Sequence, residues 1–148
     1  MKTSALTREI SVKDDFAVLV VDDDLDIRET LREVIEAEGF QVSCAANGAE
    51  AMHLLGSGSR PGLIILDLMM PVMSGWEFLT KMRGDEALAG IPVAVVSASG
   101  GRTPPVGATR FLRKPIDLDT ILELIREHGA TSRSWDAPSA QETRISHA

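Results

Sequence analysis

The side chains of this chain best suited to chemistry are three carboxylates and one amine, those of Asp22, Asp23, Asp67 and Lys114. In each of the three places where they occur, a short apolar run typical of a buried strand precedes them. Parallel strands bring their last residues to one edge of a sheet, so the four side chains can meet there. Carboxylates gathered at one edge repel one another unless a cation lies among them. We therefore predict a divalent metal site beside a nucleophilic carboxylate, with the lysine placed to meet an anion.

The apolar periodicity around these residues predicts strands that alternate with helices. The expected strands are residues 18–21, 40–45, 63–66, 91–96 and 111–114. The expected helices are residues 25–38, a short one carrying 51–55, then 76–83 and 117–128. Because βα crossovers are nearly always right-handed, such an alternation favours an α/β fold with a parallel sheet covered on both faces.

The composition narrows the classes of protein to consider. A net charge of −7 argues against direct binding of nucleic acid. The single cysteine, Cys44, excludes an internal disulfide framework. No run approaches the roughly 18 apolar residues of a membrane span, and the start of the chain lacks the apolar core of a secretory signal. We expect a soluble cytoplasmic protein.

The chain length of 148 residues suits one domain. The periodic part runs from residue 16 to residue 129, and we expect it to form that domain. The polar stretch 1–15 is expected to be a flexible leader, and 130–148 a disordered tail.

Four short motifs, each placed after an expected strand, carry a resemblance to a known family. They are Val-Val-Asp-Asp at 20–23, Leu-Asp-Leu-Met-Met-Pro at 66–71 followed by Gly75, Val-Ser-Ala at 96–98, and Lys-Pro at 114–115. In this order they resemble the receiver domain of bacterial two-component response regulators, including the single-domain chemotaxis type. The resemblance implies a doubly wound, flavodoxin-like sheet of five parallel strands in the order 2-1-3-4-5, with its site at the carboxyl edge.

The resemblance also implies roles for particular residues around the metal. Asp67 matches the aspartate that is phosphorylated in the family, and it is also expected to be a ligand of the Mg²⁺ ion. Asp22 and Asp23 match the acidic pair that holds Mg²⁺, and the backbone carbonyl of Met69 matches a further metal ligand. Magnesium prefers hard oxygen ligands of this kind, so the donor set suits the ion.

Three further residues are implied to meet or sense the phosphoryl group. Ser97 occupies the position of the hydroxyl that contacts it, and Lys114 that of the lysine that pairs with it. Phe111 lies where the family often places a switching aromatic. In a loose phosphoryl-transfer transition state, charge spreads over three oxygens that a cation, an ammonium and a hydroxyl can each address.

Plainer interpretations stay open for several of these positions. The acidic run that ends at Asp24 could cap the following helix, and Asp24 suits that role best. Ser97 could serve only as a turn residue, and Phe111 only as part of the core. Met69 and the methionines near it could form a partner-binding surface or fill a loop.

The expected function is a switch that takes a phosphoryl group from a phosphohistidine onto Asp67. The donor would be a sensor histidine kinase or a histidine phosphotransfer protein, and a downstream protein would read the result from a monomer or weak dimer without an output domain. The alternative is a degenerate receiver that binds proteins regardless of phosphate. A turnover enzyme such as an aspartyl phosphatase is disfavoured, since Met69 stands where such enzymes carry a second acid.

The segment 98–113 departs from the family pattern. It is about five residues shorter than usual and contains two consecutive prolines and three glycines. Within a helix these cost about 3 kcal/mol per proline and 1 kcal/mol per glycine. We therefore predict that the fourth helix of the family is absent or shortened, and hypothesise that residues 99–110 order or disorder with phosphorylation.

Overall fold

The computed structural model describes residues 16–70, 72–98 and 107–136, the stretch 130–136 as backbone alone. The strands are β1 (Ala17–Val21), β2 (Gln41–Ala45), β3 (Leu63–Asp67), β4 (Val93–Ser97) and β5 (Arg110–Arg113). The helices are α2 (Leu25–Ala37), α3 (Gly48–Gly56), α4 (Gly75–Arg83) and α5 (Leu118–Asp136). The strands and helices expected from the sequence are all present, with ends that differ by a few residues except in α5.

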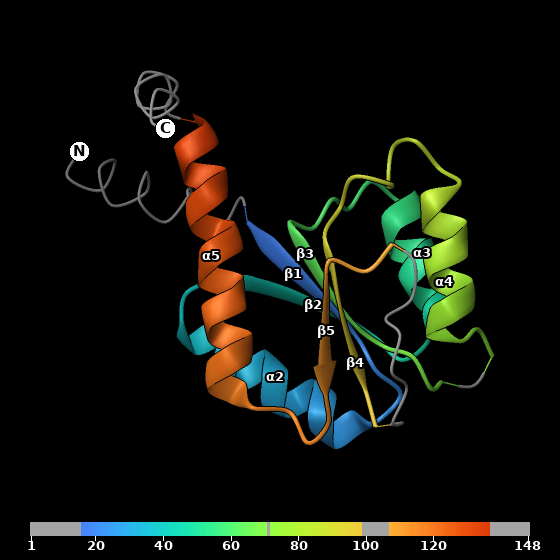
Figure 1. Cartoon of the computed structure of the whole chain (residues 1–148), viewed down its shortest axis with the longest axis horizontal. Helices are drawn as coiled ribbons and strands as arrows, with labels where there is room; N and C mark the ends of the chain where they lie inside the picture. The colour runs from blue at the N-terminus through green and yellow to red at the C-terminus, as the bar shows by residue number, and fades with distance from the viewer. Residues whose placement is uncertain (1–15, 71, 99–106, 137–148) are drawn as a thin grey trace.

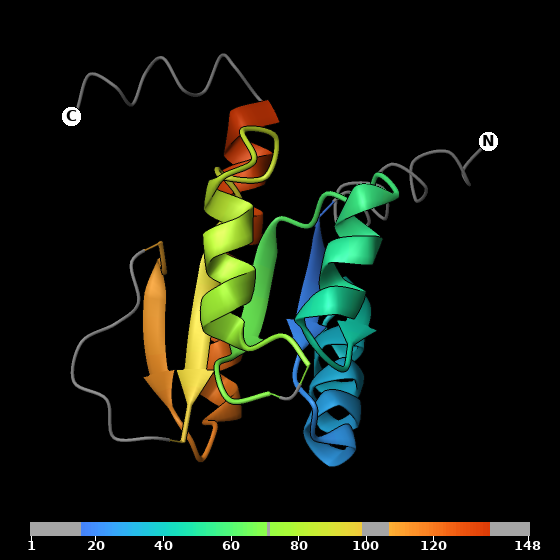
Figure 2. The same cartoon turned by 90° about the vertical axis from the view of Figure 1, so that its right-hand side faces the viewer.

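All five strands are parallel and lie in the order β2-β1-β3-β4-β5, which confirms the doubly wound fold. The sheet lies between α2 and α5 on one side and α3 and α4 on the other (Figures 1 and 2). In the register of β1 and β3, Val21 pairs with Leu66, so Asp22 and Asp67 come next along two neighbouring strands. The same edge of the sheet therefore receives both carboxylates.

The apolar runs are continuous because both faces of the sheet are covered. Along β1, Val18 and Val20 pack with the α2 and α5 side, whereas Leu19 and Val21 pack with the α3 and α4 side. All four of these side chains are buried, and so is every residue of β3 and β4. An apolar side chain at every position is what a strand between two helical layers requires.

Two helices begin next to the sheet edge that carries the carboxylates. Asp24 caps α2, since its carboxylate accepts hydrogen bonds from the backbone N–H groups of Asp26 and Ile27. This confirms the capping role predicted for Asp24. Ser74 and Glu77 form a reciprocal capping box at the start of α4. The two loops that lead from β1 and β3 are thus tied to the first turns of the helices that follow them.

Helix α5 is longer than the sequence analysis predicted. We expected the helix to end near residue 128 and the chain to lose regular structure after Gly129, which is wrong for residues 130–136. Gly129 is buried, and a Cβ atom built on it would lie 3.3 Å from the Phe40 ring. It therefore lets α5 lie close to an aromatic residue instead of ending the helix. The rest of the expected tail, 137–148, and the expected leader, 1–15, lie outside the described residues.

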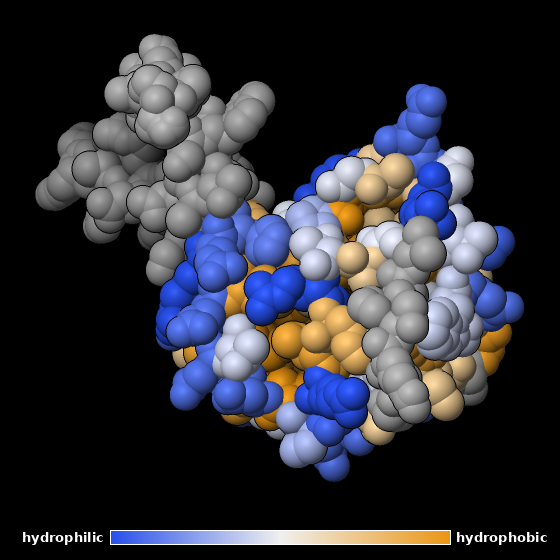
Figure 3. Space-filling model, viewed as in Figure 1, coloured by the Kyte–Doolittle hydropathy of each residue, from blue (hydrophilic) through white to orange (hydrophobic). Residues whose placement is uncertain are grey.

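No helix is found in the described residues between β4 and β5. Residue 98 and residues 107–109 are turn or irregular, and residues 99–106 lie outside the described part, so the hypothesis about 99–110 stays a prediction. The four helices of the described residues are consistent with a shortened fourth family helix. In the view of Figure 1, apolar surface is visible in the middle of the molecule, around the position of β5 (Figure 3). Of the described helices, none is both long and apolar enough to cross a lipid bilayer.

Candidate functional site

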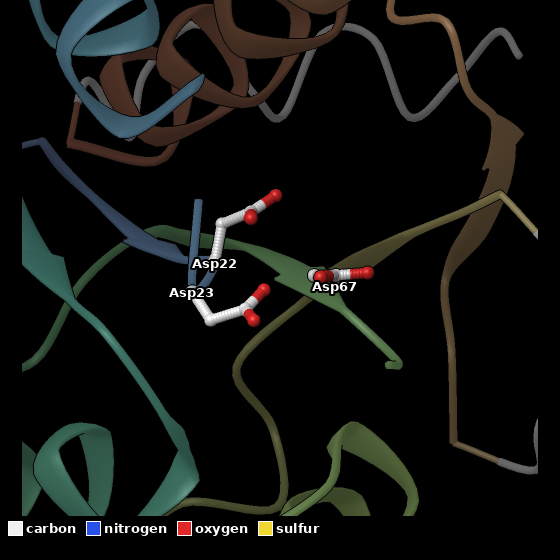
Figure 4. A group of neighbouring side chains, drawn as sticks. All are labelled: Asp22, Asp23 and Asp67. Atoms are coloured by element: carbon white, nitrogen blue, oxygen red, sulfur yellow. The ribbon is translucent and has the colours of Figure 1, made fainter. Parts of the chain in front are cut away.

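The three carboxylates singled out in the sequence gather at the ends of β1 and β3, Asp22 and Asp23 directly after β1 and Asp67 as the last residue of β3 (Figure 4). Asp22, Asp23 and Asp67 can each offer an oxygen so that the three atoms lie within 4.8 Å of one another. Asp22 and Asp67 are each only 3% exposed, whereas Asp23 faces solvent. The group thus combines two buried anions with one at the surface, from which an ion can enter.

Lys114, which directly follows β5, completes the cluster. Its Nζ lies 3.2 Å from Asp22 Oδ2 and 3.6 Å from Asp67 Oδ2. The backbone helps to place it, since the Lys114 N–H donates to the Ser97 carbonyl at 3.0 Å where β4 ends. One ammonium among three carboxylates leaves negative charge uncompensated in a largely buried place. A hard divalent cation with oxygen ligands fits that deficit, so the residues present suit Mg²⁺.

The electrostatics of the cluster show in the pKa of Asp67. Burial first, and then the charge of Asp22, raise this pKa from 3.8 to about 6, against the opposing effects of Lys114 and of the hydrogen bond from the Met69 N–H. Burial lowers the pKa of Lys114, but the charges of Asp22 and Asp67 outweigh it and the pKa is raised overall. Lys114 therefore stays an ammonium ion, while Asp67 is a carboxylate that would gain from another cation nearby.

The other three residues predicted for the site lie in different surroundings. Ser97 is the last residue of β4 and is buried. Met69 is 60% exposed, and its backbone N–H donates to Asp67 Oδ1 at 3.3 Å. Phe111 in β5 is half-buried and packs against the core cluster on the α3 and α4 side. The Met69 backbone therefore contacts a carboxylate of the cluster, Ser97 contacts the Lys114 backbone through its carbonyl, and Phe111 contacts the core.

The loop from β3 to α4 is held at its ends, and its side chains Met69 and Val72 are exposed. Gly75 N–H donates to the Leu68 carbonyl at 3.0 Å, and a Cβ on Gly75 would lie 2.6 Å from the Asp67 carbonyl oxygen. Only glycine permits so close an approach of α4 to the strand end. Between these points Val72 is 79% exposed and has a φ of 70°, which β-branched residues rarely adopt.

An open hollow of about 310 Å³ adjoins the cluster between α2 and the start of α5. Lys114 belongs to its lining, so the hollow and the carboxylate cluster share a side chain. The remaining lining is largely apolar and consists of Asp26, Ile27, Thr30, Leu31, Pro115, Ile116 and Leu118.

One residue at the site was missed by the sequence analysis. Arg28 in the first turn of α2 donates from Nη1 to the Asp22 carbonyl at 2.8 Å. The available signal was its place four residues after the helix cap Asp24, in a first turn that also carries Asp26. That placement does not distinguish an ordinary surface arginine from one that reaches back to the strand end.

The chain matches the response regulator receiver domain family over residues 18–126. It is 34% identical over 135 residues to the response regulator Rre1 of Synechocystis sp., covering 87% of this chain and 58% of that protein. It is 33% identical over 136 residues to the response regulator MprA of Mycobacterium tuberculosis, covering 87% and 57%. The chain thus spans a little over half the length of these curated relatives.

Solved structures of similar proteins have the same fold. Chemotaxis protein CheY4 of Vibrio cholerae is 32% identical, with a TM-score of 0.66, over 76% of this chain and 97% of that one. The response regulator TrrA of Thermotoga maritima, solved in complex with Mg²⁺-BeF, is 29% identical with a TM-score of 0.67, over 76% and 98%. The match to the family, the order of the strands and these similarities agree, and the chain belongs to the response regulator receiver domain family.

Proposed function

We propose that Asp67 accepts a phosphoryl group from a phosphohistidine and that the resulting acyl phosphate is the signal. Receiver domains are phosphorylation-dependent signalling switches and not turnover enzymes, and they interact with histidine kinases or phosphotransfer proteins. The observation that carries the proposal for this chain is the cluster itself. Asp67 is buried among two further carboxylates and lies 3.6 Å from the Lys114 ammonium.

The reaction balances with the groups at hand. A carboxylate oxygen of Asp67 forms a bond to phosphorus while the P–N bond of the donor phosphohistidine breaks, and the released imidazole nitrogen keeps the electron pair. In this proposal Lys114, the Ser97 hydroxyl and the Met69 N–H would meet the phosphoryl oxygens as charge develops on them. Later attack by water on phosphorus returns inorganic phosphate and the free carboxylate.

A divalent cation would be held by Asp22, Asp23, Asp67 and the Met69 carbonyl, and would offset the negative charge that two approaching anions share. The ionised Asp67 carboxylate is the nucleophile, so its raised pKa makes the acceptor pH-sensitive when no cation is bound. The similar TrrA, which was solved with Mg²⁺-BeF, supports assigning this ion to the present chain.

The hollow beside Lys114 suggests how a donor protein approaches. Its lining is mostly apolar and it opens next to the cluster, so a partner with an apolar face could bring its phosphohistidine to Asp67. We place the readout in a downstream protein that distinguishes the phosphorylated form. The competing proposal of a phosphate-independent binding module would not explain why these four charged side chains cluster.

Intact-mass measurement after incubation with acetyl phosphate and Mg²⁺ tests the proposal. The wild-type chain should gain the mass of one phosphoryl group, and the gain should disappear when EDTA replaces Mg²⁺. The substitution Asp67→Asn keeps the shape of the side chain and should abolish the gain. If the wild type gains no mass, or if the Asp67→Asn variant gains it equally, the phosphoryl-acceptor assignment is wrong and the binding-module alternative is favoured.

A further inference from the structure

Arg28 makes a contact that the proposed chemistry does not use. Its guanidinium Nη1 donates to the backbone carbonyl of Asp22 at 2.8 Å, and its side chain is half-buried. The carbonyl belongs to the residue that contributes one of the buried carboxylates. A hydrogen bond to a cationic donor is roughly twice as strong as one between neutral groups.

With this contact, every polar group of Asp22 has a partner. Its N–H donates to the Ala45 carbonyl at 3.1 Å, its Oδ1 accepts from the Asp24 N–H at 2.9 Å, and its Oδ2 lies 3.2 Å from Lys114 Nζ. Arg28 supplies the fourth partner, the one for the carbonyl. Asp22 is therefore fixed in both its backbone and its side chain.

The carbonyl of Asp22 shares a planar peptide unit with the N–H of Asp23. Holding the oxygen therefore fixes the peptide plane that leads to the Asp23 Cα. The next peptide is held by the Asp24 N–H, which donates to Asp22 Oδ1, so the two contacts together restrict the direction of the Asp23 Cα–Cβ bond. Asp23 is exposed, so packing does not provide that constraint. The link is rigid at its other end as well, because the Arg28 N–H donates to the Asp24 carbonyl at 3.0 Å within the capped first turn of α2.

We infer that Arg28 is a positioning residue for the divalent cation, acting through the Asp22–Asp23 peptide. The inference rests on the proposed binding of that cation at this site. Arg28 contacts neither the cation nor the phosphoryl group. It holds the exposed carboxylate in the direction that converges with the two buried ones.

The direction in which Mg²⁺ affinity changes when Arg28 is removed distinguishes a positioning role from a simple effect of its charge. Arg28 is a cation near a cluster of anions, so its charge alone opposes the binding of Mg²⁺, and its removal should tighten binding. A positioning role predicts weaker binding, because a freed Asp22–Asp23 peptide no longer holds the carboxylate ligands in directions that converge. Loss of such an outer partner weakens metal affinity by about 10-fold or more.

Arg32 provides a matched control one turn further along α2. It is partly exposed and pairs with Glu36 at 3.7 Å on the helix surface. Both arginines lie near β2, since the charges of Arg32 and Arg28 each lower a Cys44 pKa that burial raises overall. Arg32→Ala thus removes a nearby charge without touching the Asp22 carbonyl.

Calorimetric titration of the full chain with Mg²⁺, without phosphodonor, makes the comparison. We expect Arg28→Ala to weaken binding about 10-fold. Arg28→Lys should lie between it and the wild type, since lysine keeps the charge but loses the planar fork of donors. Arg32→Ala should stay within about 2-fold of the wild type or bind slightly more tightly. Amide hydrogen exchange at Asp24, whose N–H donates to Asp22 Oδ1, should be faster in Arg28→Ala and unchanged in Arg32→Ala.

The outcomes distinguish the inference from the function on which it rests. If the wild type binds Mg²⁺ and Arg28→Ala binds it equally or more tightly, the positioning role is wrong while the proposed function stands. If the wild type takes up no Mg²⁺ at millimolar concentration, both are wrong. Should Arg28→Ala fail to fold, Arg28→Lys decides the question, because a lysine variant with wild-type affinity and wild-type exchange at Asp24 would overturn the role.

Discussion

The two loops that frame the cluster are built in opposite ways. In the turn after β1, each polar group of Asp22 has a partner, and the carboxylates of Asp22 and Asp23 themselves face the site. In the loop after β3, the contribution beyond Asp67 comes from the backbone of Met69, whose side chain is 60% exposed. The loop after β1 thus contributes side chains to the site from a backbone that is held in place. The loop after β3 contributes backbone groups, while its apolar side chains Met69 and Val72 are exposed.

Because the two loops contribute different groups, substitutions should affect the site differently in each of them. A side-chain ligand is lost when its residue changes, whereas a backbone group is kept as long as the loop keeps its path. The path of the β3–α4 loop depends on the close approach at Gly75 and on the conformation at Val72. Substitutions can therefore test each loop separately.

The largest effect is expected from Asp22→Asn, which keeps the acceptor for the Asp24 N–H but removes the charge that faces Lys114. We expect Mg²⁺ affinity to fall about 100-fold, at least as much as the loss of an outer partner costs. Met69→Ala in the other loop should change affinity by less than about 2-fold, as exposed substitutions usually do. Calorimetric titration measures both. Equal losses would contradict the assignment of side chains to one loop and backbone to the other.

A smaller but still large effect is expected from Gly75→Ala. The added methyl would lie 2.6 Å from the Asp67 carbonyl oxygen and 2.7 Å from the Leu68 Cα, so α4 must shift away from the strand end. Overpacking of this kind destabilises by about 1–3 kcal/mol.

Gly56→Ala at the end of α3 is the matched control, because its Cβ would meet nothing within 4 Å. It should raise the free energy of unfolding by up to about 1 kcal/mol, since alanine is the better helix former. Urea denaturation of both variants provides the comparison. If Gly75→Ala is as stable as the wild type, the proposed limit on the approach of α4 is wrong.

Much of the fold was predictable because its signals are local. β1 is apolar throughout and β3 is apolar up to Asp67, as expected for strands covered on both faces, and Asp24 follows β1 where a helix cap is needed. Because parallel strands end at one edge of the sheet, the sequence also predicted that Asp22, Asp67 and Lys114 would lie close together.

The features that the sequence analysis missed depend on partners far along the chain or on a particular backbone path. Gly129 was expected to end α5, but its neighbour is the ring of Phe40, which no local pattern reveals. Arg28 reaches a carbonyl six residues earlier, and that contact exists only because α2 begins directly at the strand end. The positive φ of Val72 runs against the local preference of valine, so the sequence around it does not predict it.

A pH-dependent difference is expected from Asp67→Asn in protein freed of metal by EDTA. The folded protein raises the pKa of Asp67 from 3.8 to about 6, so it favours the neutral form. The stability from that preference is complete below about pH 4 and is lost as the pH rises through 6. Asparagine cannot ionise, so its advantage over aspartate should grow by about 2 kcal/mol between about pH 4.5 and pH 7.5.

Urea denaturation at the two pH values measures this advantage, and Mg²⁺ supplies an internal control. Added cation should stabilise the wild type more than Asp67→Asn, because a ligand stabilises the state that binds it more tightly. A difference that is independent of pH, or a wild type that is the more stable of the two at pH 7.5 in EDTA, would contradict the raised pKa.

The smallest effect is expected at Val72, in the loop that offers its backbone. A left-handed conformation costs a residue with a side chain about 1–2 kcal/mol, and glycine avoids this cost while losing about 0.5–1 kcal/mol through its freer unfolded chain. Val72→Gly should therefore stabilise the protein by about 0.5–1 kcal/mol in urea denaturation. Val72→Ala keeps a Cβ at the same φ of 70° and should leave stability nearly unchanged. If both variants behave alike, the φ of Val72 is not a source of strain, and the exposed valine is held by contacts of its own.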